Sequence, residues 1–293
     1  ESRRTVDCAS FLAFSGELAA AGSPEGLLER LTAFYQTHGV GLLGMGQVFR
    51  ARRTGDGAEL VPVEDRPPVR LADLGGYRQQ KDLLIRNTEA FLRGKGSNNV
   101  LLYGDAGTGK STSIQALVNE YADQGLRLIE LYKEQYDLIP AILRQVKGRN
   151  YRFLLFLDDL SFEENETSYK YLKAVMEGGA EAPPENVRIC ATSNRRHLIK
   201  ETLTDRTGDD IHEADTRQEL MSLSARFGLT VTFQRPEKAR FETILEQLAK
   251  QHNIQMPTEQ LLLKAEAFAL RAGGRSPRVA KQFIEQCEAG VQK

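Results

Sequence analysis

The chain has 293 residues, of which 41% are hydrophobic and 27% are charged. These proportions are typical of a globular protein and exclude a disordered or collagen-like chain. At about 150 residues per domain, the length allows roughly two domains. The 39 basic and 40 acidic side chains give a formal net charge of −1, so the composition does not support binding to nucleic acid or an anionic membrane, although it does not exclude nucleic acid.

The cysteines and the apolar runs indicate a cellular location. Cys8, Cys190 and Cys287 are far apart and form no Cys-x-x-Cys pair, which argues against a disulfide framework or a zinc site. The densest apolar run, residues 153–157, is five residues long and far too short to cross a bilayer. We therefore expect a cytoplasmic protein that does not span a membrane.

The first part of the chain predicts helices followed by a hairpin. Residues 1–37 read as two helices, the second beginning at Pro24 with Ser23 as its N-cap. Two short strand-like segments, 47–50 and 58–61, are separated by a turn sequence and predict a β-hairpin. Because prolines and charges then interrupt the pattern, we expect residues 1–65 to form an N-terminal extension.

The rest of the chain predicts an α/β domain and a helical domain. Strand patterns alternate with helical ones, which predicts a parallel sheet. The expected strands are residues 99–103, 126–131, 151–157 and 187–192. Beyond Pro236 the pattern is helical, at residues 237–251, 257–272 and 276–290. We therefore expect an α/β domain over residues 66–235 and a small helical domain over residues 236–293.

A glycine-rich motif follows the first of these strands. Residues 104–111 match G-x-x-x-x-G-K-[ST], between an apolar strand ending at Tyr103 and a helical pattern beginning at Gly109. In this context, backbone N–H groups and the helix N-terminus bind phosphate. Lys110 is expected to reach the β and γ phosphates, and the Ser111 hydroxyl to bind Mg²⁺. The expected nucleotide-binding residues are Gly104, Asp105, Ala106, Gly107, Thr108, Gly109, Lys110, Ser111 and Thr112.

A second motif supplies the acidic side chains that such a site requires. Residues 153–157 are all apolar and are followed by Asp158 and Asp159, a Walker B pattern. We expect Asp158 to hold Mg²⁺ and Asp159 to activate the attacking water as a base. The next predicted strand is followed by Asn194, which would lie beside these acids in a parallel sheet and orient the water.

With these motifs, the chain from about Leu71 to the C-terminus resembles an AAA+ ATPase. The stretches 104–111, 158–162 and 191–198 together resemble the bacterial family of predicted ATPases called domain of unknown function 815. The resemblance implies an AAA+ parallel-sheet core with a C-terminal helical lid, ATP and Mg²⁺ as ligands, and a homo-oligomer that acts on a protein client. Most such ATPases carry glutamate where this chain has Asp159, so the shorter side chain suggests slow turnover.

The resemblance also assigns residues outside the two motifs. The stretch that contains Leu74 and Gly76 is similar to the segment that cups adenine in AAA+ proteins. Asn194 matches sensor 1, and Arg278 matches sensor 2 at the start of a lid helix. Ser276 and Pro277 support this position of Arg278, because they are typical of an N-cap and a first helical turn.

The resemblance offers more than one arginine finger. Residues 223–229 resemble the box around this arginine in the bacterial replication initiator and its helicase-loader relatives, which favours Arg226. Arg195 and Arg196 are alternatives. An arginine finger enters the active site of a neighbouring subunit and stabilises charge in the transition state, so hydrolysis would require an oligomer.

Three functions remain open on the sequence. The first is Mg²⁺-dependent ATP binding and hydrolysis that rearranges an oligomer or a client. The second is a nucleotide-controlled binding module with little turnover. The third is a DNA-associated ATPase similar to an initiator or helicase loader, which the near-neutral charge does not favour.

Overall fold

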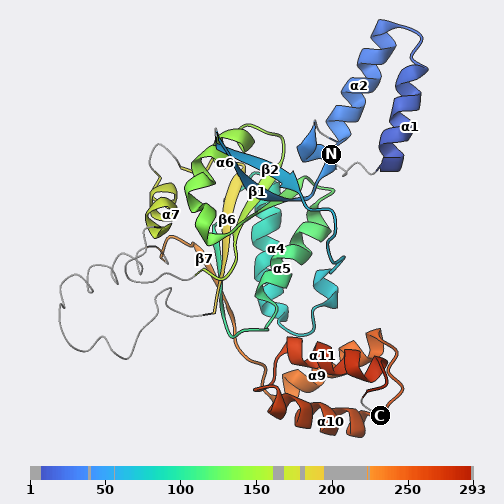
Figure 1. Ribbon diagram of the computed structural model, residues 1–293, viewed down its shortest axis with the longest axis vertical. Helices are drawn as coiled ribbons and strands as arrows, with labels where there is room; N and C mark the ends of the chain where they lie inside the picture. Colours follow the sequence, from blue (N-terminus) through green and yellow to red (C-terminus); the bar gives the residue numbers. More distant parts are fainter. Residues whose placement is uncertain are drawn as a thin grey trace, which may run out of the picture.

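The protein has an α/β fold with one seven-stranded sheet in the order β2-β1-β4-β5-β6-β3-β7 (Figure 1). The computed structural model describes residues 8–38, 41–55, 57–160, 168–178, 182–194, 223 and 225–291. The strands are β1 (Val48–Thr54), β2 (Gly57–Pro62), β3 (Val100–Gly104), β4 (Leu126–Leu131), β5 (Arg152–Leu157), β6 (Val187–Ser193) and β7 (Leu229–Phe233). Only β1 and β2 pair antiparallel among these, which confirms the mainly parallel sheet.

The N-terminal helices form a hairpin at one end of the molecule (Figure 1). They are α1 (Cys8–Ala19) and α2 (Pro24–His38), followed by the single turn α3 (Leu42–Met45). The Ser23 hydroxyl accepts the Gly26 N–H at 3.1 Å, the contact expected of an N-cap. The rings of Phe14 and Phe34 stack with their centroids 3.7 Å apart, and this contact joins the two helices.

The predicted β-hairpin joins the edge of the sheet. β1 and β2 pair through residues 49–54 and 57–62, and β1 also pairs parallel to β4, with Val48 opposite Leu128. The hairpin from the predicted N-terminal extension therefore shares one sheet with the strands that follow residue 66.

Helices cover both faces of the sheet (Figure 1). One face packs against α4 (Arg78–Leu92) and α5 (Lys110–Tyr121), and the other against the 3-10 helix η2 (Lys133–Leu138), α6 (Ile139–Val146) and α7 (Ser168–Met176). Along β5, Phe153 and Leu155 enter one buried cluster, whereas Leu154 and Phe156 enter the other. A strand buried on both faces must be apolar throughout, which explains the continuous apolar run.

Two elements of the core were not predicted. β7 pairs with β3, and α4 buries Leu84, Thr88 and Phe91 at helical spacing. The β7 segment is only five residues long and alternates with threonine, and α4 is mostly polar. A short edge strand and a helix with a narrow apolar stripe both give weak periodic signals.

Three helices form the C-terminal lid, close to the predicted positions. They are α9 (Lys238–Gln251), α10 (Thr258–Arg271) and α11 (Pro277–Glu288), which share a separate buried cluster. Figure 1 shows these three helices below the sheet. The Ser276 hydroxyl accepts the Val279 N–H at 3.2 Å, so Ser276 caps α11. In the part of the chain that the structure describes, every helix is too short or too polar to cross a membrane.

Candidate nucleotide-binding site

The glycine-rich motif forms a loop between β3 and the N-terminus of α5. Gly104, Gly107 and Gly109 have φ angles of 135°, 75° and 93°. L-residues that carry a side chain rarely adopt such backbone angles. Within the described residues, no protein acceptor takes the backbone N–H groups of Gly107, Thr108 or Gly109. The loop therefore presents backbone donors beside a helix N-terminus, the arrangement that binds phosphate.

Gly104 is required by the close approach of β7. A Cβ atom at this position would lie 2.0 Å from the Phe233 carbonyl oxygen. We expect Gly104→Ala to lower the free energy of unfolding by about 3–5 kcal/mol, because backbone strain and steric overlap add. Gly148→Ala is the matched control, because Gly148 also has a positive φ but has open space around it. Denaturant unfolding of both variants measures the difference, and equal losses would contradict the steric argument.

Lys110 is the buried cation of the loop. Its side chain is 6% exposed, and its Nζ donates hydrogen bonds to the carbonyls of Gly104 and Asp105 at 2.8 Å and to Asn194 Oδ1 at 2.9 Å. Burial lowers the pKa of the Lys110 ammonium, while nearby carboxylates act in the opposite direction. The carbonyls of Gly104 and Asp105 and the Asn194 side chain after β6 therefore fix the ammonium at the base of the glycine-rich loop.

The two acids after β5 lie at the same edge of the sheet. Asp158 Oδ1 accepts hydrogen bonds from the Ser111 hydroxyl at 2.7 Å and from the Thr192 hydroxyl. Asp159 has a φ of 53°, and its Oδ1 accepts a hydrogen bond from Asn194 Nδ2 at 2.8 Å. Because β6 lies between β3 and β5, the carboxyl ends of the three strands bring these side chains together.

A cleft of about 630 Å³ extends from the loop between the sheet domain and the lid. Gly107, Thr108, Gly109 and Thr112 line it on one side, and Leu74 lines it on another. The lid contributes apolar and cationic side chains, namely Ile244, Leu248, Pro277, Arg278 and Lys281. The cleft therefore combines an apolar wall with backbone N–H donors and cationic side chains. A nucleotide site needs both, the wall for the base and the donors for the phosphates.

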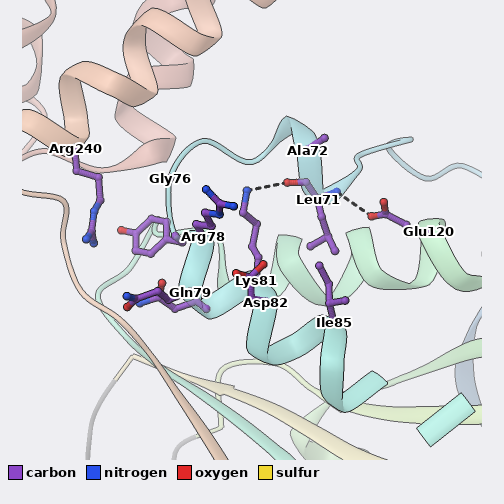
Figure 2. Close-up of a pocket in the computed structure, with 12 residues that line it drawn as sticks. Leu71, Ala72, Gly76, Arg78, Gln79, Lys81, Asp82, Ile85, Glu120 and Arg240 are labelled. Carbon is purple, nitrogen blue, oxygen red and sulfur yellow. Dashed lines mark hydrogen bonds between the residues drawn. The ribbon is translucent and has the colours of Figure 1, made fainter. Parts of the chain in front are cut away.

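The segment expected to cup adenine is fixed by Lys81 of α4. Lys81 Nζ donates to the carbonyls of Leu71 and Leu74 at 3.1 and 2.8 Å, and burial lowers its pKa. Figure 2 shows Lys81 directed at the Leu71 carbonyl and the Leu71 N–H directed at Glu120. Leu74 lines the cleft, whereas Gly76 lines the adjacent pocket of Figure 2.

Arg278 lies at the junction of the lid and the loop. Its backbone N–H donates to the Gly107 carbonyl at 3.1 Å, and its side chain lines the cleft. A Cβ atom on Gly107 would lie 3.2 Å from Arg278 Cβ and from Ser276 Oγ. The N-terminus of α11 therefore contacts the glycine-rich loop directly.

The expected arginine fingers are placed differently. Arg226 Nη2 lies 3.4 Å from Glu177 Oε1, next to the C-terminal end of α7, and both side chains are partly exposed. No contact between Arg226 and the phosphate-binding loop is found among the described residues. Arg195 and Arg196 lie outside the described residues.

Sequence reasoning missed two residues that contact the site. Thr192 contacts both acids after β5. Arg235 donates its backbone N–H to Asp105 Oδ2 at 2.8 Å and a guanidinium N–H to the Gly273 carbonyl at 3.1 Å, which links the loop to the lid. A threonine in an apolar strand and an arginine next to Pro236 were the available signals, and neither is specific.

Comparison with known proteins identifies the fold. The Replication factor C large subunit of Methanococcus vannielii is 31% identical over 104 residues, which cover 33% of this chain and 21% of that protein. The Staphylothermus marinus protein of the same name is 38% identical over 90 residues, which cover 30% and 21%. The chain thus spans about a fifth of the length of the curated relatives it matches.

Solved structures show which fold the chain has, and a family model shows to which family it belongs. The Thermotoga maritima RuvB Holliday junction branch migration motor has a TM-score of 0.51 at 18% identity, and the match covers 75% of this chain and 64% of that one. The FIGL-1 AAA domain in complex with ADP has a TM-score of 0.52 at 16% identity and covers 76% and 73%. The model described as "Protein of unknown function (DUF815)" matches residues 46–291. The chain therefore has the AAA+ fold and belongs to the DUF815 family.

Proposed function

We propose that this chain is a Mg²⁺-dependent ATPase that couples its nucleotide state to rearrangement of an oligomer or a bound protein client. One observation carries the proposal. Asn194 bridges the two motifs, because its Oδ1 accepts from Lys110 Nζ at 2.9 Å and its Nδ2 donates to Asp159 Oδ1 at 2.8 Å. One amide thereby holds the proposed phosphate-binding cation and the proposed general base close together, and hydrolysis of a bound triphosphate uses groups of both kinds.

The residues present fit a magnesium ion. The Ser111 hydroxyl and the Asp158 carboxylate are 2.7 Å apart, and oxygen ligands of this kind are the ones that Mg²⁺ prefers. Ser111 and Asp158 would hold the ion, which neutralises developing charge on phosphate oxygens when bound. The backbone N–H groups of Gly107, Thr108 and Gly109 direct their partial positive charges into the same site, where they would bind the negatively charged triphosphate.

In the proposed reaction, water attacks the γ phosphorus and the bond to the β–γ bridging oxygen breaks, giving ADP and inorganic phosphate. Asp159 accepts a proton from the attacking water, and Asn194 holds Asp159 in position. Lys110 stabilises negative charge on the β and γ phosphates. Arg278 approaches the γ phosphate from the lid. The hydrogen bond from its backbone N–H to the Gly107 carbonyl supports this role, because it holds the start of α11 against the loop.

Leu74, together with Ile244 and Leu248 of the lid, supplies an apolar wall suited to adenine. Gly76 lines the adjacent pocket and not the cleft, so its proposed contact with the base is through the backbone of the turn that it shares with Leu74. Because the lid forms part of this wall, nucleotide binding and release would move the lid relative to the sheet domain.

A homo-oligomer would complete the site. The Arg226 side chain is 42% exposed, so it is accessible to the active site of a neighbouring copy as an arginine finger. The cytoplasmic location is part of this proposal, and the free thiols of Cys190 and Cys287 are compatible with it.

A nucleotide-controlled switch with little turnover is the second candidate. The shorter side chain of Asp159 favours it, since a base that reaches the water less well slows hydrolysis. In that case the mass of the oligomer in solution should rise with ATP even when hydrolysis is blocked by Asp159→Asn.

A DNA-associated ATPase is the third candidate, favoured by the relatives named for replication factor C and Holliday junction branch migration. The formal charge of −1 does not favour it. DNA binding that weakens as salt rises would support this function, and absence of binding at low salt would exclude it.

Phosphate release from ATP by the purified chain tests the leading proposal. We expect steady release with Mg²⁺ and none with EDTA, because Ser111 and Asp158 act through the metal. Release that is unaffected by EDTA would contradict the assigned metal role, and folded protein without release at any concentration of subunits would contradict the assignment as a hydrolase.

A further inference from the structure

Thr192 connects the two acids that follow β5. It is 2% exposed, near the end of β6, where it lies between the phosphate-loop strand β3 and β5. Its hydroxyl donates a hydrogen bond to Asp158 Oδ1 and accepts the backbone N–H of Asp159 at 3.0 Å. A hydroxyl has one donor and two acceptor positions, so both contacts form at the same time.

Thr192 also holds the backbone beyond the acids. Its carbonyl accepts the Leu160 N–H at 2.6 Å, so three consecutive residues after β5 contact this threonine. Asp158 Oδ1 accepts a second hydroxyl, that of Ser111. The carboxylate orientation is thus determined from both the loop side and the β6 side.

The backbone of Asp159 requires this support. Its φ of 53° is in the left-handed region, which costs about 1–2 kcal/mol for a residue with a Cβ atom. The Asp159 N–H is held by Thr192, and the Asp159 carboxylate by Asn194. Without the Thr192 hydroxyl, the Asp159 N–H loses its partner, and the turn keeps only the Asn194 contact and the Leu160 N–H bond to the Thr192 carbonyl.

We infer that Thr192 is a positioning residue, which fixes the metal-binding carboxylate of Asp158 and the base Asp159 in one geometry. This inference rests on the proposed function, since both acids act on ATP only in that function. Groups that orient a metal ligand typically change metal affinity or activity by about 10–100-fold when removed.

Thr192→Val tests the inference, because valine has nearly the same shape and lacks the hydroxyl. We expect kcat for ATP hydrolysis to fall about 10–100-fold with KM nearly unchanged, and the Mg²⁺ concentration needed for nucleotide binding in calorimetry to rise. Thr192→Ser keeps the hydroxyl and should restore most of both losses. Thr230→Val, in the exposed part of edge strand β7, is the matched control and should behave as wild type.

The outcomes separate this inference from the function on which it rests. If wild type hydrolyses ATP and Thr192→Val matches it in kcat and Mg²⁺ dependence, the inference is overturned and the proposed function stands. If Thr192→Ser loses as much as Thr192→Val while both unfold at the wild-type temperature, packing and not the hydroxyl is responsible, which also overturns it. If folded wild type neither binds nor hydrolyses ATP, the function and the inference fail together.

Discussion

Replacing Lys110 with alanine is expected to lower ATP hydrolysis by about 10²–10³-fold, the effect typical of removing a fixed donor that stabilises transition-state charge. Lys110 Nζ contacts two loop carbonyls and Asn194, so its position is set before nucleotide binds. The variant removes the buried cation of the phosphate-binding loop, and nucleotide affinity should fall as well. Steady-state phosphate release and nucleotide titration measure the two losses.

The control for this prediction is Lys95→Ala. Lys95 is an exposed lysine in the turn after α4, far from the loop in the fold. Its replacement should leave hydrolysis and affinity unchanged. Near wild-type hydrolysis by folded Lys110→Ala would show that the loop does not act on phosphate.

Asp159→Asn is expected to lower turnover by about 10²–10⁴-fold while nucleotide binding remains, because general-base catalysis contributes about that much. Asparagine has nearly the same size, and its carbonyl oxygen still accepts the hydrogen bond from Asn194. It does not take a proton from water. Binding by calorimetry and turnover by phosphate release therefore separate in this variant.

Asp123→Asn, at an exposed position in the turn after α5, is the matched control for the charge change and should be neutral. Full hydrolysis by Asp159→Asn would contradict the role of Asp159 as base. Loss of nucleotide binding together with turnover would instead assign Asp159 to binding. Because the variant should hold ATP without turnover, it is also the form from which a stably bound client is most readily recovered.

The motifs of this site were predictable because their chemistry is contiguous in sequence. Residues 104–111 contain the loop, its cation and its hydroxyl in one stretch, and residues 153–159 contain a buried strand and both acids. Asn194 followed from the geometry of parallel strands, whose carboxyl ends meet at one edge. Periodicity likewise located α9, α10 and α11 to within one or two residues.

The remaining features depend on contacts between distant segments. The pairing of β1 with β4 joins residues about eighty positions apart, and no local pattern encodes it. The link from Asp105 through Arg235 to Gly273 likewise crosses two domains. Thr192 was visible as a polar residue in an apolar strand, but only its contacts with Asp158 and Asp159 give it a role.

Isothermal titration calorimetry of the folded chain with ATP, with and without Mg²⁺, tests the central claim most directly. The account predicts saturable binding at one site per chain, strengthened by Mg²⁺ and greatly weakened in Lys110→Ala. No heat of binding by folded wild type at any Mg²⁺ concentration would contradict the claim that the loop between β3 and α5 binds a nucleoside triphosphate.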